Sequence, residues 1–292
     1  MPFTINQDLC ASCGSCWSIC PNRVVVKREG GYFVSEMCCD CGTCVPYCPT
    51  GAIGEGKVKV ELNNKKLHYA LKDKLSLTRD VTAMKFADKP PQGVRVEEGP
   101  HFWCAICGDI FDGTGSPVFF SAKASTCGGS AMIGIGAGKY SREEFDAAIE
   151  AEVAGEGKHF ATKDEMSKAR SFFPRYPKAF GGMILASLEE MPVPDLVLLP
   201  ITGRQMSMIS TAYTFDTGQI IMGYMGSALC MMTIAIPYLE NRPVFSCGDY
   251  SGRNFMRLKD GENVVCLPYK LVPGLVKNLD RTVYAHETHE SE

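Results

Sequence analysis

Two cysteine runs, at residues 10–21 and 38–49, have the residue type and spacing needed to bind metal. Each run reads C-x2-C-x2-C-x3-C-P. Thiolates are soft ligands, and this spacing is typical of loops that hold iron–sulfur clusters. Disulfides and zinc are the alternatives, but two complete copies of the pattern favour iron–sulfur chemistry.

The fourth cysteine of each run differs in position from the first three. Three thiolates on one tight loop reach three irons of one cube, whereas the fourth lies past the loop, before a proline that turns the chain away. The fourth is therefore better placed for the other cube. Residues 1–62 resemble the two-cluster bacterial ferredoxins, with every ligand position filled. We predict two [4Fe–4S] clusters, the first held by Cys10, Cys13, Cys16 and Cys48 and the second by Cys38, Cys41, Cys44 and Cys20.

Length and charge limit the classes of protein and partner. The chain has 292 residues, 45% hydrophobic and 22% charged, which suits two globular domains. A polar junction at 63–66 predicts domains at 1–62 and 63–292. The formal net charge is −3 with no basic block, which argues against nucleic acid as a partner. Each oxidised cluster adds about −2, so we expect a redox partner protein with a basic docking surface.

The cysteines and the apolar stretches predict the cellular compartment of the protein. The first residues show neither a charged leader nor an apolar run, so no signal peptide is predicted. Cluster ligation needs reduced thiols, which predicts a cytoplasmic protein of an anaerobe. One uncharged stretch, Gln219–Leu239, is long enough to cross a bilayer. Glycine and hydroxyl residues dilute its hydrophobicity and no basic flank marks a cytoplasmic side, so we predict a buried strand and helix and no membrane contact.

Patterns beyond residue 63 predict helices and strands in irregular alternation. Strands are predicted at Val81–Phe86, Asp195–Leu199 and Val264–Leu267, and helices at Tyr176–Met191 and Arg204–Asp216. This irregular order does not suit a Rossmann fold. The expected class is α+β, with a ferredoxin-type domain followed by a larger mixed α/β domain.

Six cysteines lie outside the two runs. Cys230 and Cys266 sit in apolar stretches and are predicted to be small core residues. The other four have a glycine close after them, which lets backbone N–H groups approach a sulfur: Cys104, Cys107, Cys127 and Cys247. They form a candidate third iron–sulfur site, while structural zinc is less favoured without a second Cys-x2-Cys knuckle. A redox-active dithiol at Cys104 and Cys107 and purely structural cysteines remain open alternatives.

A family resemblance covers residues 81–279. Its motifs include Met84-Lys85-Phe86, Cys127-Gly128-Gly129, Pro194-Asp195-Leu196-Val197 and Ser246-Cys247-Gly248, in that order. This region is similar to domain-of-unknown-function family 169, which is found in anaerobic archaea and bacteria, often beside ferredoxins. A cysteine at 104 is usual in that family and one at 107 is less so. The family name implies no activity.

Other signals are weaker. The run Gly134-x-Gly136-x-Gly138-Lys139 fits neither the P-loop nor the dinucleotide fingerprint, so we predict a tight turn, with a flavin phosphate as the functional alternative. Arg204 and Arg253 each follow a glycine. Each could bind an anionic ligand or form an ordinary ion pair, and the sequence favours neither role. No catalytic triad or paired-carboxylate motif is visible, and catalytic residues are unknown.

The leading functional hypothesis is electron transfer through two [4Fe–4S] clusters to or from a redox site in the C-terminal domain. One alternative is an enzyme, a ferredoxin-coupled iron–sulfur oxidoreductase that uses flavin or thiols to reduce a small molecule. Another is a non-catalytic accessory or assembly subunit of a larger oxidoreductase complex. A homo-oligomer is compatible with each of these hypotheses.

Overall fold

The computed structural model describes residues 3–35, 38, 41–55, 64–99, 102–115, 117–121, 161–162, 164–165, 168, 180–224 and 229–282. The chain divides into two compact units. The first takes in the chain up to Leu77 together with Arg204–Ile221 and the part from Tyr269 onward, and the second takes in Thr78–Gly203 and Met222–Pro268. The domain boundary predicted at 62–63 stays a prediction.

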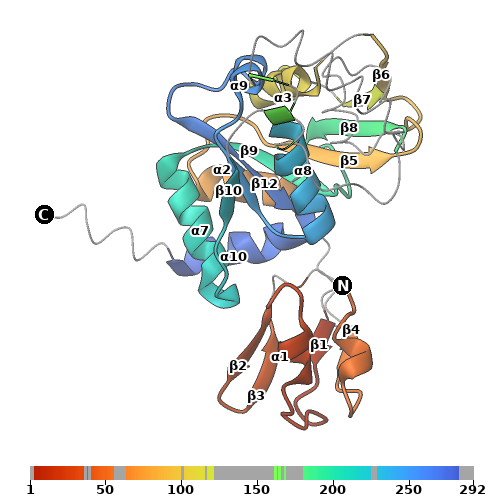
Figure 1. Ribbon diagram of the computed structural model, residues 1–292, viewed down its shortest axis with the longest axis vertical. Coiled ribbons are helices and arrows are strands. Elements are labelled where there is room, and N and C mark those ends of the chain that lie inside the picture. Colours follow the sequence, from red (N-terminus) through yellow and green to blue (C-terminus); the bar gives the residue numbers. More distant parts are fainter. Residues whose placement is uncertain are drawn as a thin grey trace, which may run out of the picture. The chain divides into compact units, whose positions relative to one another are not determined.

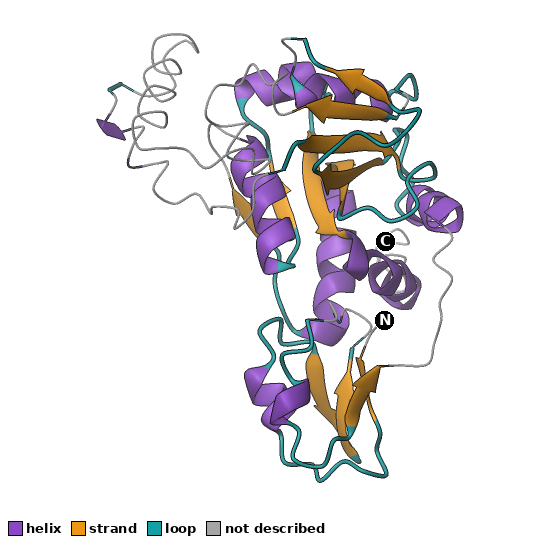
Figure 2. Ribbon diagram, turned by 90° about the vertical axis from the view of Figure 1, so that its right-hand side faces the viewer, coloured by secondary structure: helices purple, strands orange, loops and turns teal. Residues whose placement is uncertain are grey.

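Short elements build the N-terminal segment (Figure 2): β1 Phe3–Ile5, α1 Ser15–Ile19, β2 Val25–Arg28, β3 Gly31–Val34, the 3-10 helix η1 Val45–Tyr47, and β4 Ile53–Glu55. β1 pairs antiparallel with β4, and β2 pairs antiparallel with β3. A small apolar core contains Ile5, Val25, Tyr32 and Ile53 together with cysteines of both runs. The cysteines therefore make up a large part of the small core of this segment.

Three longer helices complete the first unit: α2 Asn64–Lys74, α7 Gly203–Thr217 and α10 Val272–Thr282, which follows the 3-10 helix η3 Tyr269–Leu271. The Asn278 side chain of α10 donates to the Ala212 carbonyl of α7 at 3.1 Å, and Gln205 of α7 donates to the Leu75 carbonyl at 2.8 Å. Gly218, with φ of 67°, follows the last residue of α7, within one residue of the end predicted at Asp216. These side-chain hydrogen bonds thus hold together helices that are distant in the sequence.

Eight strands form one mixed sheet in the described part of the second unit: β5 Thr82–Ala87, β6 Arg95–Glu97, β7 Val118–Ser121, β8 Gly182–Ser187, β9 Leu196–Thr202, β10 Met222–Tyr224, β11 Val244–Ser246 and β12 Glu262–Pro268. Their order across the sheet is β10-β11-β12-β9-β5-β8-β7-β6 (Figure 1). The β10–β11 and β6–β7 pairs are parallel and the others antiparallel. This arrangement confirms the predicted mixed architecture.

One face of this sheet packs against two helices, α3 Trp103–Phe111 and α8 Leu229–Glu240, and a third helix, α9 Tyr250–Phe255, packs against α3. Alternate residues of β5 and β9, such as Met84 and Leu198, meet Trp103 and Ile110 of α3 in one apolar core. Residues of the opposite register, such as Val197, are also fully buried. Burial on both faces accounts for the continuous apolar runs of the central strands.

The structure confirms the strands predicted at 81–86, 195–199 and 264–267, but one predicted helix is wrong. Gly182–Ser187, within the predicted helix 176–191, is strand β8 between β5 and β7. A Cβ at Gly182 would lie 2.4 Å from the Phe120 carbonyl oxygen, so the glycine permits the close approach of β7. The apolar run fits a two-sided buried strand as well as a helix, and its sheet neighbours decide between them.

The uncharged stretch Gln219–Leu239 contains β10 and most of α8, so the predicted strand and helix are both present. The strand is not buried as predicted, because β10 lies at an edge of the sheet and Met222 is 52% exposed. Ile234, Ala235 and Ile236 of α8 are at most 2% exposed. Among the helices that the structure describes, none is both long enough and apolar enough to cross a membrane.

Candidate metal centres

Two small hollows in the N-terminal segment are lined by cysteine. The first hollow is lined by Cys10, Cys13, Cys16 and Cys48, with Ile5, Tyr32 and Ile53 beside them. The second hollow is lined by Cys20, Cys38, Cys41 and Cys44, with Phe3, Val24 and Val34 beside them. Both hollows are partly open to solvent.

Each hollow takes three cysteines from one run and the fourth from the other. Proline follows both fourth cysteines and disfavours a helical conformation of the residue before it. Cys20 ends α1 with φ −64° and ψ 113°, and Cys48 follows η1 with φ −85° and ψ 109°. This extended backbone carries each fourth thiol away from its own loop. The grouping is the one that the spacing predicts for exchanged ligands.

Left-handed backbone shapes the two loops. Gly14 has φ of 79° and precedes α1, and Gly42 has φ of 69° at the equivalent place in the second run. A Cβ at Gly14 would come within 2.8 Å of the Tyr32 hydroxyl, which packs against this loop. Glycine therefore provides both the turn and the room for the loop beside the first hollow.

The thiols of the hollows differ in acidity. Burial raises the pKa of Cys44 to about 11, and the neighbouring Cys38 adds to this rise. Burial likewise raises the pKa of Cys16. Hydrogen bonding from Ser15 lowers the pKa of Cys13, which is exposed. Four thiolates in so small a space repel one another, so the set suits a centre that carries compensating positive charge.

The arrangement of the thiols bears on the kind of centre. No group of three or more His, Cys, Asp or Glu side chains in the described parts of the chain is arranged around a single metal ion. A cube of iron and sulfur needs its four thiolates farther apart, one at each iron. The four cysteines at each hollow provide one thiolate for each iron of such a cube.

Three hydroxyl groups contact the thiols of the two runs. Ser15 Oγ lies 3.4 Å from Cys13 Sγ, Thr43 Oγ1 donates to Cys41 Sγ at 3.3 Å, and Thr50 Oγ1 lies 3.7 Å from Cys48 Sγ. Each hydroxyl is two residues after its cysteine, so the sequence contained this signal.

The cysteines of the second unit have different surroundings. Cys104 and Cys107 lie on α3 with exposures of 5% and 0%, in the apolar core that also contains Cys266. Burial raises the pKa of Cys107, and the nearby Cys104 and Cys266 add to the rise. The prediction that Cys266 is a core residue is confirmed. These surroundings are those of small apolar side chains in a core.

The third cluster at four of the six cysteines outside the two runs stays a prediction. Cys127 lies outside the described residues, as does the glycine run at 134–139. Cys247 is partly exposed in the turn between β11 and α9, while Cys104 and Cys107 belong to the core cluster. The backbone at Cys230 belongs to α8, but its side chain is outside the described set.

Arg253 supports the turn at Cys247. Its guanidinium donates to the carbonyl oxygens of Cys247 at 2.7 Å, Glu262 at 2.9 Å and Lys259 at 3.2 Å. Gly248, with φ of 77°, lies against the Arg253 stem. These bonds give Arg253 a structural role in the turn.

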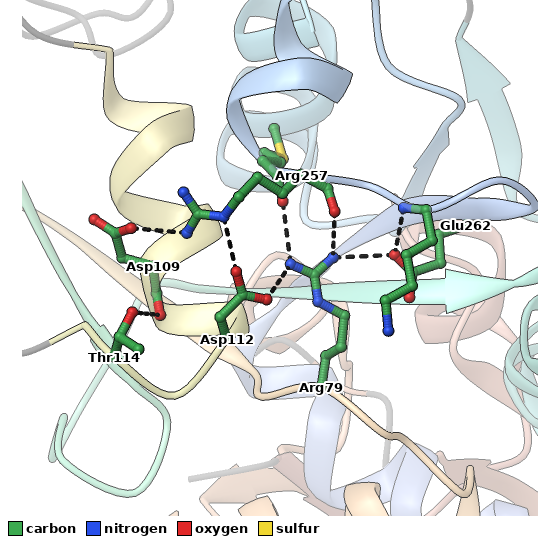
Figure 3. A network of polar contacts seen from close by, with 8 residues as sticks. Arg79, Asp109, Asp112, Thr114, Arg257 and Glu262 are labelled. Carbon is green, nitrogen blue, oxygen red and sulfur yellow. Dashed lines mark hydrogen bonds and ion pairs between the residues drawn. The ribbon is translucent and has the colours of Figure 1, made fainter.

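Sequence reasoning missed a network around Arg79 (Figure 3). Arg79 is 6% exposed and donates to Asp112 at 2.7 Å and to Glu262 at 3.0 Å. It also donates to the carbonyl oxygens of Met256 and Arg257, while Arg257 pairs with Asp109 and Asp112 at 2.7 Å each. Burial alone would raise the pKa of Asp112, but hydrogen bonds from Arg257 and Arg79 lower it. The network joins the end of α3 to the loop between α9 and β12.

Comparison with known families defines the class of the protein. Residues 9–70 match the 4Fe-4S dicluster domain, so this part is a ferredoxin-type iron–sulfur domain with the capacity for electron transfer. Residues 70–278 match the DUF169 family, described as uncharacterised ArCR, and this match covers more than half of the chain. The chain belongs to the DUF169 family, and the predicted fusion with a ferredoxin domain is confirmed. No curated protein and no solved structure matches the chain.

Proposed function

We propose that the protein transfers electrons through two [4Fe–4S] clusters with exchanged fourth ligands. Cys10, Cys13, Cys16 and Cys48 hold the first cluster, and Cys38, Cys41, Cys44 and Cys20 hold the second. The observation that carries the proposal is the pair of hollows, each lined by four thiols grouped in this way. A bound cubane cluster supplies one-electron chemistry at low potential.

The residues around the hollows position the thiolates and limit their contact with water. Cys16 and Cys44 are buried at 7% and 8% exposure, whereas Cys13 and Cys41 face solvent. Ile5, Tyr32 and Ile53 cover the first hollow, and Phe3, Val24 and Val34 cover the second. An apolar wall on one side and an open rim on the other suits a site that exchanges electrons without admitting a substrate.

Iron and acid-labile sulfide, counted per chain after anaerobic purification, test this proposal. Two clusters predict about eight irons, and a third cluster at Cys104, Cys107, Cys127 and Cys247 predicts about twelve. We expect about eight, unchanged in the Cys104→Ala/Cys107→Ala variant, because both thiols lie in the apolar core. A count near zero would contradict the proposed function. A count near twelve that drops to eight in the double variant would establish the third cluster.

The partner is proposed to dock beside the first hollow. Three large apolar side chains of this segment are more than half exposed, and each adjoins a ligand of the first cluster: Leu9 at 52% before Cys10, Trp17 at 56% after Cys16, and Tyr47 at 56% before Cys48. Exposed aromatic groups are frequent centres of protein interfaces. Together with the negative charge of the clusters, they suit a redox protein that has a basic rim and an apolar centre.

Cytochrome c, a basic redox protein, is a suitable probe for this surface. The reduced protein should transfer electrons to cytochrome c at a rate that falls with ionic strength, and Trp17→Ala should slow this transfer. Reduction of benzyl viologen, a small acceptor that needs no docking surface, serves as the control and should keep its rate. Equal rates with cytochrome c for both proteins would exclude Trp17 from the docking surface.

Two alternative functions stay predictions: a ferredoxin-coupled reductase and an accessory subunit. A bound flavin, a homo-oligomer and a cytoplasmic location also stay predictions. Flavin absorbance in the purified protein would favour the reductase. Stable co-purification with a larger oxidoreductase would favour the accessory subunit.

A further inference from the structure

Three side-chain hydroxyls stand in a regular relation to the proposed cluster ligands. Ser15 and Thr43 occupy equivalent places in the two runs, each two residues after the second cysteine, and their oxygens lie 3.4 and 3.3 Å from the sulfurs of Cys13 and Cys41. Thr50 lies two residues after the fourth cysteine of the second run, with its oxygen 3.7 Å from Cys48 Sγ. The same local geometry therefore occurs at three ligand positions.

Ligation fixes the direction of these contacts. In a free thiol either sulfur or oxygen can donate, and that ambiguity holds for Ser15 with Cys13 and for Thr50 with Cys48. A thiolate bound to iron has no proton and only accepts, while a hydroxyl group donates one hydrogen bond. All three hydroxyls must then donate to sulfur. Such charge-assisted bonds are stronger than bonds between neutral groups.

We infer that Ser15, Thr43 and Thr50 raise the reduction potential of the cluster whose thiolate each one contacts. This inference rests on the proposed function. Reduction adds one electron from an external donor and makes the cluster and its thiolates more negative by one charge. A hydrogen bond to sulfur stabilises this more negative state more than the oxidised state, so it favours reduction.

The exchanged ligands make the assignment specific. Ser15 contacts Cys13 and Thr50 contacts Cys48, and both of these thiols line the first hollow. Thr43 contacts Cys41, which lines the second hollow. Thr50 is therefore a positioning residue for the first cluster, although it lies in the second run. A simple one-run-per-cluster arrangement would assign Thr50 to the second cluster.

Redox titration with dithionite, followed by electron paramagnetic resonance, tests the inference. Ser15→Ala and Thr50→Val should each make reduction of one cluster about tenfold less favourable, which lowers its midpoint by about 59 mV for a one-electron couple. The double variant should move the same wave by roughly the sum. Thr43→Val should move the other wave. If the two clusters of the wild-type protein have the same midpoint potential, the Ser15→Ala/Thr50→Val variant should show two reduction waves. One wave should stay at the wild-type midpoint and the other should lie at a lower potential.

Matched variants separate a hydrogen-bond effect from general disturbance of the loops. Ser18 donates to the Ser15 carbonyl oxygen and Thr4 is exposed on β1, so Ser18→Ala and Thr4→Val should leave both midpoints unchanged. Thr43→Ser and Thr50→Ser keep a hydroxyl group and should restore most of the wild-type potential. Iron content is measured on every variant and should stay at about eight per chain.

The outcomes distinguish the inference from the function beneath it. Wild-type protein without iron or labile sulfide would contradict the proposed function itself. Full iron content with unmoved midpoints in all three hydroxyl variants would overturn the inference and leave electron transfer intact. A Thr50→Val shift in the same wave as Thr43→Val would overturn the assignment of Thr50 to the first cluster.

Discussion

The cysteine pairs of the N-terminal segment and the Cys104–Cys107 pair share a spacing but differ in backbone and surroundings. In the N-terminal runs, the pairs lie on loops that contain left-handed residues such as Gly14 and Gly42, and their sulfurs line hollows that are open to solvent. Cys104 and Cys107 lie on one regular helix, α3, with their sulfurs in an apolar core. The same three-residue interval thus serves two different purposes.

The difference shows what spacing alone determines. Residues three apart on a helix share a face, so the Cys-x2-Cys interval places both sulfurs on the side of α3 that packs against the sheet. On a loop, the same interval lets both sulfurs converge on one ligand while backbone N–H groups stay near them. The local conformation and the access of water therefore decide which cysteine pairs can bind metal.

The largest expected effect concerns the exchange of ligands between the two runs. Cys20→Ala should lower the iron content from about eight to about four per chain, because it removes one ligand of the second cluster. Adding Cys41→Ala should lose little more iron, since both residues serve the same cluster. Adding Cys13→Ala instead should abolish the remaining iron. If the second and third variants exchanged these results, each run would hold its own cluster.

A second prediction concerns the second unit, where we expect packing and ion pairs, and not metal ligation, to stabilise the fold. Arg79→Met should lower the free energy of unfolding by about 3 kcal/mol, because it leaves the buried Glu262 carboxylate without its ion-pair partner. Urea unfolding followed by circular dichroism measures this loss, and iron content should not change.

Arg95 provides the matched control, since it pairs with Glu97 through a side chain that is 57% exposed. Arg95→Met should cost less than about 1 kcal/mol. Equal effects of the two replacements would show that burial of Arg79 adds nothing to stability.

A third prediction applies directly to the cysteines of α3. Cys107→Ala should destabilise the protein by about 1–2 kcal/mol through loss of buried contacts, with no change in iron or in the redox titration. Native Cys107 should also resist alkylation by iodoacetamide, because it is buried and its pKa is raised. Cys247, which is partly exposed, is the reference thiol. Loss of iron in Cys107→Ala would show that Cys104 and Cys107 bind metal, as the N-terminal cysteines are proposed to do.

The smallest expected effect compares the turns that follow the two runs. Arg23 has φ of 50°, while the equivalent residue after the second run is Gly51 with φ of 63°. Arg23→Gly should relieve the left-handed backbone and raise stability by less than about 1 kcal/mol, since glycine also gains freedom in the unfolded chain. Thermal unfolding measures the gain. Arg28→Gly, in strand β2, should lower stability instead.

Local patterns in the sequence predicted local features well. The two runs with their prolines, and apolar strands at 81–86 and 264–267 that largely coincide with β5 and β12, could be identified from neighbouring residues. Strand β8 was mistaken for a helix because its apolar run fits both, and only its partners β5 and β7 distinguish them. Arg79 gave no local signal, since its partners Asp112 and Glu262 are 33 and 183 residues away. Their convergence depends on the folded sheet.

The sheet topology also has a consequence for the order of folding during synthesis. The central strand β5, at 82–87, pairs with β8 at 182–187 and β9 at 196–202, so it emerges from the ribosome long before its partners. The strands of the N-terminal segment all lie between Phe3 and Glu55 and find their partners early. Non-local pairing is slow, and chains generally fold from the N-terminal domain onward. The cysteine loops can therefore be complete and ready for cluster loading while the apolar edges of β5 still await their neighbours.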